Sequence, residues 1–160
     1  MNIRLNTLWR VPVFCLAAGW IAFYLTIYMG WFYVVKTTGP DGVVDVSIDP
    51  IRSTFLDAAL FVLVLLIGGL WLFRSMTKAE IAVSAAILAA FYLTITILEL
   101  VLPSFPTALS LMLAEFFDWT SAIYSLLYQI THQLELSIIL SCFAPFLFVP
   151  FGRKAAAPAE

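Results

Sequence analysis

Long apolar runs separated by short polar segments form the dominant pattern of the sequence. A membrane-spanning helix needs about 20 consecutive, mostly apolar residues. Four runs meet this requirement, and they cover residues 11–35, 55–73, 79–102 and 120–148. The pattern predicts an all-α integral membrane protein, a bundle of four transmembrane helices in which residues 1–160 form a single transmembrane domain.

The first loop, over 36–54, contains the signals of a short hairpin on the outer side. A Gly-Pro-Asp-Gly sequence at 39–42 is a strong turn signal. Apolar and polar residues then alternate over 44–48, as they do in a half-buried strand. We therefore expect a hairpin-like excursion in this loop.

Helix-start signals precede the second and third runs. Asp49 and Pro50 have the residue types of an N-cap and a first helical residue. Thr77 and Glu80 have the spacing of a capping box. In the fourth run, Pro145 is expected to kink the helix.

The second loop, over 103–119, begins with two prolines and continues as an apolar stretch. Residues 108–117 are long enough for two to three helical turns, which predicts a short interfacial helix on the outer side. Residues 153–160 are expected to form a flexible tail.

Composition supports the membrane assignment and excludes several classes of protein. Hydrophobic residues make up 63% of the chain and charged residues 11%, whereas a soluble domain has about 25% charged residues. The formal net charge is −2 and the eight Lys and Arg are scattered, so no basic patch for nucleic acid is present. Membrane lipids are therefore the expected surroundings, and no nucleic acid is expected as a partner.

The distribution of Lys and Arg predicts the orientation of the spans, because cytoplasmic loops are enriched in these residues. Lys36 and Arg52 lie on one side of a four-span arrangement, and the other side carries Arg4, Arg10, Arg74, Lys78, Arg153 and Lys154. We expect both termini to be cytoplasmic and the chain to reside in a bacterial inner (plasma) membrane.

Small residues indicate how the second and third spans pack. Gly68 and Gly69 lie near the inner end of the second span, and Ala82, Ala86 and Ala90 share one face of the third. The short turn between these spans makes them antiparallel neighbours. Membrane helices associate through such small residues, so we expect the two glycines to face the alanines.

An aromatic stripe runs along the first span and is formed by Trp20, Tyr24, Tyr28 and Trp31. One interpretation is helix packing combined with an aromatic belt at the outer interface. The other is a flat apolar wall for a lipid, quinone or isoprenoid, or for a partner protein, because aromatic rings offer large rigid contact areas.

Polar residues of three spans fall at a similar depth near the outer interface. They are Asp57, Glu99, Gln129, His132 and Glu135. In one interpretation, water and headgroups solvate them and Arg52 pairs with Asp57, since a charge costs less near the interface. In the other, they form an outward-facing polar pocket that holds a cation, relays a proton or orients a lipid headgroup.

The same residues limit the chemistry that the chain offers. His132 and Glu135 are three apart, so one helix would place them on a shared face, but a single His-x-x-Glu pair is a weak metal signal. One His cannot supply both axial ligands of a haem within one chain. Cys15 and Cys142 are isolated within apolar runs. We predict no metal site, and the sequence indicates no particular cofactor.

Three functions are consistent with these patterns. The first is a non-catalytic accessory or structural subunit that packs against another membrane protein or further copies of itself. The second is a ligand-, lipid- or cation-binding or transport protein that uses the outer polar pocket. The third is a lipid-modifying enzyme in which His132 and Glu135 act as acid and base.

Overall fold

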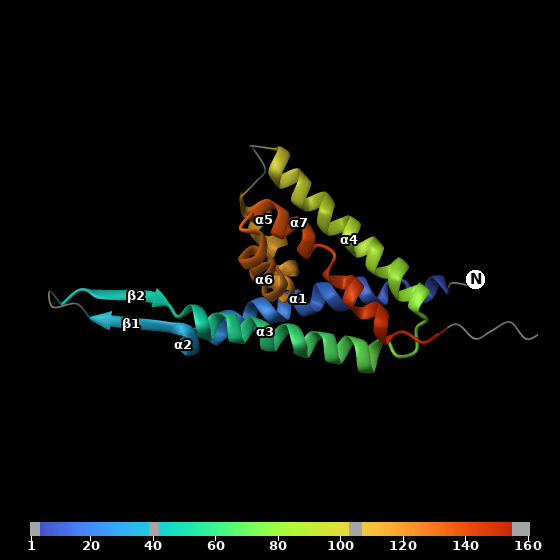
Figure 1. Cartoon of the computed structure of the whole chain (residues 1–160), viewed down its shortest axis with the longest axis horizontal. Helices are drawn as coiled ribbons and strands as arrows, with labels where there is room; N and C mark the ends of the chain where they lie inside the picture. Colours follow the sequence, from blue (N-terminus) through green and yellow to red (C-terminus); the bar gives the residue numbers. More distant parts are fainter. Residues whose placement is uncertain (1–3, 39–41, 103–106, 155–160) are drawn as a thin grey trace, which may run out of the picture.

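The computed structural model describes residues 4–38, 42–102 and 107–154, and this part of the chain is mostly helical (Figure 1). Four of its helical stretches are long and apolar enough to cross a membrane: Leu5–Tyr28, Pro50–Leu72, Lys78–Val101 and Leu134–Phe151. The expectation of a helical chain with four segments of spanning length is therefore confirmed.

The first span begins with a 3₁₀ turn, η1 (Leu5–Thr7), and continues as α1 (Arg10–Tyr28). A short helix, α2 (Gly30–Tyr33), follows. The predicted span over 11–35 was too long at its C-terminal end, because the chain changes to a β-strand at Val34. The β-branched Val34 and Val35 pair there with another strand instead of extending the helix.

That strand, β1 (Val34–Thr38), pairs with β2 (Val44–Ile48) in an antiparallel hairpin. Val34 lies opposite Ile48 and Thr38 opposite Val44. The predicted hairpin is therefore confirmed, although turn residues 39–41 lie outside the described residues.

The second span comprises α3 (Pro50–Leu66) and a wider π-helical end, η2 (Ile67–Leu72). The Asp49 carboxylate accepts hydrogen bonds from the backbone N–H groups of Ile51 (3.0 Å) and Arg52 (3.2 Å). This confirms the predicted N-cap and first helical residue. The helix thus begins before residue 55, and the first loop is shorter than the predicted 36–54.

Gly68 and Gly69 in η2 do not pack as the sequence analysis predicted. A Cβ at Gly68 would lie 2.6 Å from the ring of Phe148 and 2.7 Å from that of Phe14, and one at Gly69 would lie 2.5 Å from the ring of Phe151. The glycines therefore make room for aromatic rings of the first and fourth spans. They do not face the alanines of the third.

The third span is α4 (Lys78–Val101), and it begins with the predicted capping box of Thr77 and Glu80. Ala82 is half-buried, whereas Ala86 and Ala90 are exposed. The buried face of α4 is offset from them and consists mainly of Ile81, Ser84, Ala85, Leu88, Ala89, Tyr92, Ile95 and Thr96. The predicted face of small residues is thus not the packed one.

The rest of the chain is divided into five short helical elements, which are α5 (Thr107–Ala114), η3 (Glu115–Thr120), α6 (Ser121–Thr131), α7 (Leu134–Ser141) and η4 (Ala144–Phe151). The helix expected over 108–117 is present as α5 and the start of η3. Residues 103–106 of the second loop lie outside the described residues. The fourth spanning segment consists of α7 and η4.

The predicted single helix over 120–148 is wrong, because His132 interrupts it. His132 has a φ of 53° and the left-handed conformation, which ends α6. Non-glycine residues adopt this conformation rarely, although His does so more often than most. The corner is held by hydroxyls: Thr131 lies 2.9 Å from the Ser137 hydroxyl, which is 2.7 Å from the carbonyl of Gln133.

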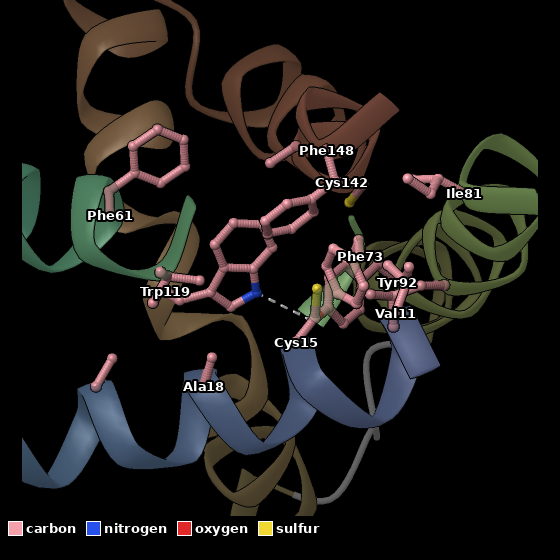
Figure 2. Close-up of a cluster of buried hydrophobic side chains, with 14 of the residues drawn as sticks. Val11, Cys15, Ala18, Phe61, Phe73, Ile81, Tyr92, Trp119, Cys142 and Phe148 are labelled. Carbon is pink, nitrogen blue, oxygen red and sulfur yellow. Dashed lines mark hydrogen bonds between the residues drawn. The ribbon is translucent and has the colours of Figure 1, made fainter. Parts of the chain in front are cut away.

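Aromatic side chains form the centre of the core (Figure 2). Trp119 of η3 is almost fully buried and stacks on Phe61 of α3, with ring centroids 5.9 Å apart. Its indole N–H points to the Tyr92 hydroxyl of α4 at 3.4 Å. Cys15 and Cys142 are buried in the same core. This packing draws η3 into the molecule, between the spanning helices.

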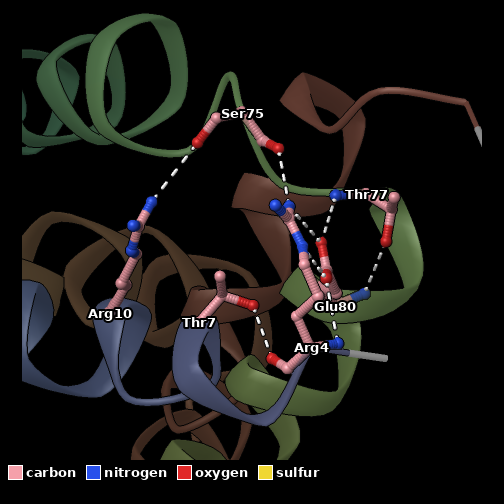
Figure 3. A network of polar contacts seen from close by, with 6 residues as sticks. All are labelled: Arg4, Thr7, Arg10, Ser75, Thr77 and Glu80. Carbon is pink, nitrogen blue, oxygen red and sulfur yellow. Dashed lines mark hydrogen bonds and ion pairs between the residues drawn. The ribbon is translucent and has the colours of Figure 1, made fainter. Parts of the chain in front are cut away.

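The described ends of the chain lie side by side, opposite the hairpin (Figure 1). Buried Glu80 binds the Arg4 guanidinium at 2.9 Å and the backbone N–H of Thr77 at 2.8 Å (Figure 3). Lys78 donates its backbone N–H to the carbonyl of Arg153 at 3.1 Å. Of the predicted tail 153–160, residues 155–160 lie outside the described residues.

Candidate functional site

A cavity of about 270 Å³ lies where α4, α5, η3, α6 and α7 meet. Two carboxylates and several hydroxyl groups contribute to its walls. The lining residues are Thr96, Glu99, Ala114, Phe117, Asp118, Thr120, Ser121, Tyr124, Ile138 and Ser141. Two carboxylates in one cavity are unusual for so apolar a chain, so this cavity is the candidate site.

The position of η3 places Asp118 at this cavity. At Gly19 of α1 the two backbones nearly touch, because a Cβ there would lie 2.2 Å from the Phe116 carbonyl oxygen. The Tyr92 hydroxyl of α4 donates to that same oxygen at 3.0 Å. Because Trp119 also stacks on Phe61 of α3, η3 is held by contacts with α1, α3 and α4.

Two of the five hydroxyl groups in the lining have already donated their hydrogen to the backbone. Thr120 donates its hydroxyl hydrogen to the carbonyl of Phe117 (2.8 Å). Ser141 donates its own to the carbonyl of Ile138 (2.7 Å). A hydroxyl that has donated its one hydrogen can only accept further hydrogen bonds. Together with two carboxylates, these groups make the lining rich in acceptors.

The two carboxylates differ in their surroundings. Asp118 lies outside the four spanning segments and is half-buried. Burial, with a smaller contribution from the charge of Asp57, raises the pKa of Asp118 to about 6. Glu99 has an exposed side chain on α4. The cavity is therefore lined by one half-buried carboxylate with a raised pKa and by one exposed carboxylate.

The five polar residues singled out from the sequence do not converge. Glu99 lines the cavity, and Asp57 is half-buried on α3 and acts on Asp118 through its charge. Gln129 lines a different hollow, between α3 and α6. His132 and Glu135 are exposed near the α6–α7 corner. Because that corner separates them, the prediction that they share one helical face is wrong.

Sequence reasoning missed Asp118 as a site residue. It falls in the predicted loop over 103–119 and was not among the polar residues assigned to the spans. The available signal was local: the segment Asp118-Trp119-Thr120-Ser121 brings three polar residues into an otherwise apolar stretch.

The aromatic stripe predicted for the first span faces outward, with Trp20, Tyr24 and Tyr28 in α1 and Trp31 in α2. Trp20, Tyr24, Tyr28 and Trp31 have between 50% and 80% of their surface exposed. Trp20 and Tyr24 make an edge-to-face contact with ring centroids 5.1 Å apart. The stripe therefore contributes little to the core of this chain.

Among the described residues, no group of three or more His, Cys, Asp or Glu side chains is arranged to hold a metal ion. No protein-family model matches the chain, and neither a curated protein nor a solved structure is significantly similar to it. Function is therefore inferred from the geometry of the chain alone.

Proposed function

We propose that this chain is a non-catalytic integral membrane protein that binds a small ligand through a positively charged amine. The ligand occupies the cavity between α4, η3, α6 and α7. The observation that carries the proposal is the acceptor-rich lining with its two carboxylates, Glu99 and Asp118.

An ammonium group matches this lining in charge and in hydrogen bonding. It has three donors and no acceptor, and its hydrogen bonds to carboxylates are roughly twice as strong as neutral ones. The hydroxyl oxygens of Thr120 and Ser141 offer further acceptors. Ala114, Phe117 and Ile138 supply the apolar contacts for a short alkyl chain.

The cavity lies toward the C-terminal end of α4. Thr96 is about 27 Å along the helix from Lys78, at a rise of 1.5 Å per residue. If the cationic end faces the cytoplasm, as the Lys and Arg distribution predicts, the cavity lies in the outer part of a hydrocarbon core about 30 Å thick. Ionisable residues in such a position are by default a functional hypothesis. One cavity supports binding; transport would also require access from the cationic end.

The test compares butylammonium with butanol, its uncharged counterpart. Binding to the purified protein in mild detergent is measured by isothermal titration calorimetry. We expect saturable binding of butylammonium and none of butanol. Glu99→Gln and Asp118→Asn should each weaken binding about tenfold or more, because a hydrogen bond to a charged group contributes about 1.5–3 kcal/mol.

Glu135→Gln is the matched control, because it removes an exposed carboxylate that does not line the cavity. It should leave the affinity for butylammonium unchanged. Equal binding of butanol and butylammonium, or equal losses in all three variants, would exclude the proposed site.

A second candidate function is that of an accessory subunit in a larger membrane complex, in a bacterial inner membrane with both termini cytoplasmic. The observation that favours it is the outward-facing stripe of Trp20, Tyr24, Tyr28 and Trp31, whose rings are left uncovered by this chain. Large rigid aromatic side chains are typical anchors of protein interfaces. The acid–base enzyme has no comparable support, since neither His132 nor Glu135 lines the cavity.

Native mass spectrometry of protein extracted from its host in mild detergent tests this second function. A second polypeptide or a further copy in fixed ratio is expected, and the double variant Trp20→Ala, Tyr24→Ala should lose it. Trp71→Ala is the control, because Trp71 is 80% exposed but lies outside the stripe. A single chain without partner, or a partner retained by the stripe variant, would argue against the subunit.

A further inference from the structure

An apolar groove of about 230 Å³ runs between α1 and α3, away from the polar cavity. Its lining is almost entirely hydrocarbon. The residues are Phe14, Ala17, Ala18, Ile21, Ala22, Leu25, Leu60, Leu63, Val64 and Ile67.

Small side chains on one wall open this groove. Ala17, Ala18 and Ala22 of α1 face larger side chains of α3 such as Leu63. From Phe14 to Leu25 the groove follows α1 for about 16 Å at 1.5 Å per residue. This length is close to one leaflet of a hydrocarbon core about 30 Å thick. A single acyl chain lying along α1 would fit these dimensions.

Two arginines stand at the end of the groove nearest the termini. Arg10 lies one helical turn before Phe14, and its guanidinium donates to the Ser75 hydroxyl at 3.3 Å (Figure 3). Arg74 directly precedes Ser75, so both arginines flank the same turn. Both are exposed, and neither forms an ion pair within the described part of the chain. Arg4 differs, because Glu80 already neutralises it.

We propose that this groove and its arginines form a binding site for an anionic phospholipid. One acyl chain lies between α1 and α3, and the phosphate group is held by Arg10 and Arg74. Guanidinium groups bind phosphate oxygens through paired, charge-assisted hydrogen bonds. Basic residues at the cytoplasmic end of spanning helices also attract anionic lipids electrostatically. The two arginines therefore select a ligand with an anionic headgroup, and the apolar groove selects a ligand that carries an acyl chain.

The site is tested with the full chain in mixed-lipid nanodiscs. The number of bound phosphatidylglycerol and phosphatidylcholine molecules is measured by native mass spectrometry after ejection. We expect a preference for phosphatidylglycerol of at least about fivefold, which the double variant Arg10→Gln, Arg74→Gln should abolish. The double lysine variant keeps the charges and should retain most of the preference. Lys36→Gln, in the hairpin, is the control for loss of a cation elsewhere.

A second pair of variants tests the acyl chain. Ala17→Phe fills the groove from its exposed edge and should reduce retained phosphatidylglycerol. Val13→Phe enlarges an exposed residue of α1 outside the groove and should not. The inference is overturned if the glutamine variant keeps the preference, or if Ala17→Phe and Val13→Phe retain lipid equally. Butylammonium binding is measured separately and does not depend on the result.

Discussion

Asp118 occupies a position where its carboxylate is half-buried and subject to the negative charge of Asp57. Both influences favour the protonated form, because burial penalises a charge and Asp57 repels it. The pKa of Asp118 is accordingly raised to about 6. At neutral pH the group is ionised, and a small fall in pH neutralises it. An ammonium ligand in the cavity would therefore respond to pH through this residue.

The affinity for butylammonium should fall about tenfold between pH 7.5 and pH 5. Asp118 is about nine-tenths protonated one pH unit below a pKa of about 6, whereas an alkylammonium, with a pKa like that of lysine near 10.4, stays charged. The pH dependence is measured by calorimetry in buffers of equal ionic strength. The Asp118→Asn variant should bind butylammonium more weakly at pH 7.5, and its affinity should not fall further between pH 7.5 and pH 5. A step of equal size in Asp118→Asn would assign the pH dependence to another group.

At the scale of elements, the crossing of α1 and η3 determines where the cavity forms. Gly19 allows the two backbones to meet, and hydrogen bonds of Tyr92 with the Phe116 carbonyl and the Trp119 indole fix η3 against α4. Close approach through a glycine is the common way in which membrane helices pack. A side chain at position 19 would push η3, and with it Asp118, away from α1.

Gly19→Ala should destabilise the protein by about 2 kcal/mol or more, because the added methyl group overlaps the Phe116 carbonyl and overpacking typically costs 1–3 kcal/mol. Gly30→Ala is the matched control, since a Cβ there meets no atom closer than 3.9 Å. Unfolding is followed by circular dichroism in detergent with increasing denaturant. Similar denaturant midpoints of unfolding for the two variants would show that α1 and η3 are not in close backbone contact at Gly19.

Local signals predicted the starts of elements well. The Asp49 cap, the Thr77–Glu80 capping box and the hairpin are all present, because each depends on residues that are neighbours in sequence. The break at His132 was missed, since neither Gly nor Pro occurs there to signal the end of a helix. The hydrogen bond between Thr131 and Ser137 stabilises this break. It forms only after the chain has turned at His132, so it leaves no local signal in the sequence.

The sequence pattern could not predict how each helix is rotated about its axis, and therefore which of its faces is buried. Ala82, Ala86 and Ala90 do share a face, but the packed face of α4 is offset from it. Large side chains decide this, since Tyr92, Phe148 and Trp119 must all be buried. For the same reason Glu99 reached the cavity, whereas Gln129 reached a different hollow and His132 remained exposed.

At the scale of the whole molecule, charge is unevenly distributed along the long axis. Arg4, Arg10, Lys78 and Arg153 gather at one end, where both described ends of the chain lie, and the hairpin projects from the other (Figure 1). Cytoplasmic loops carry the excess of Lys and Arg. The arrangement therefore predicts that the hairpin faces outward.

Single-cysteine labelling tests this orientation, because the two native cysteines are buried. Thr38→Cys in the hairpin should react with a membrane-impermeant maleimide in intact cells. Lys154→Cys should react only after the membrane is permeabilised. Labelling in the reverse order would place the cationic end outside and move the cavity to the inner half of the membrane.

The central claim is that an amine ligand occupies the cavity beside Glu99 and Asp118. The most direct measurement is photo-crosslinking with a diazirine-bearing alkylammonium, followed by peptide mapping. Labels are expected on residues 94–101 and 117–124, and excess butylammonium, but not butanol, should suppress them. Labels spread over the exposed aromatic stripe, or unaffected by butylammonium, would contradict the claim.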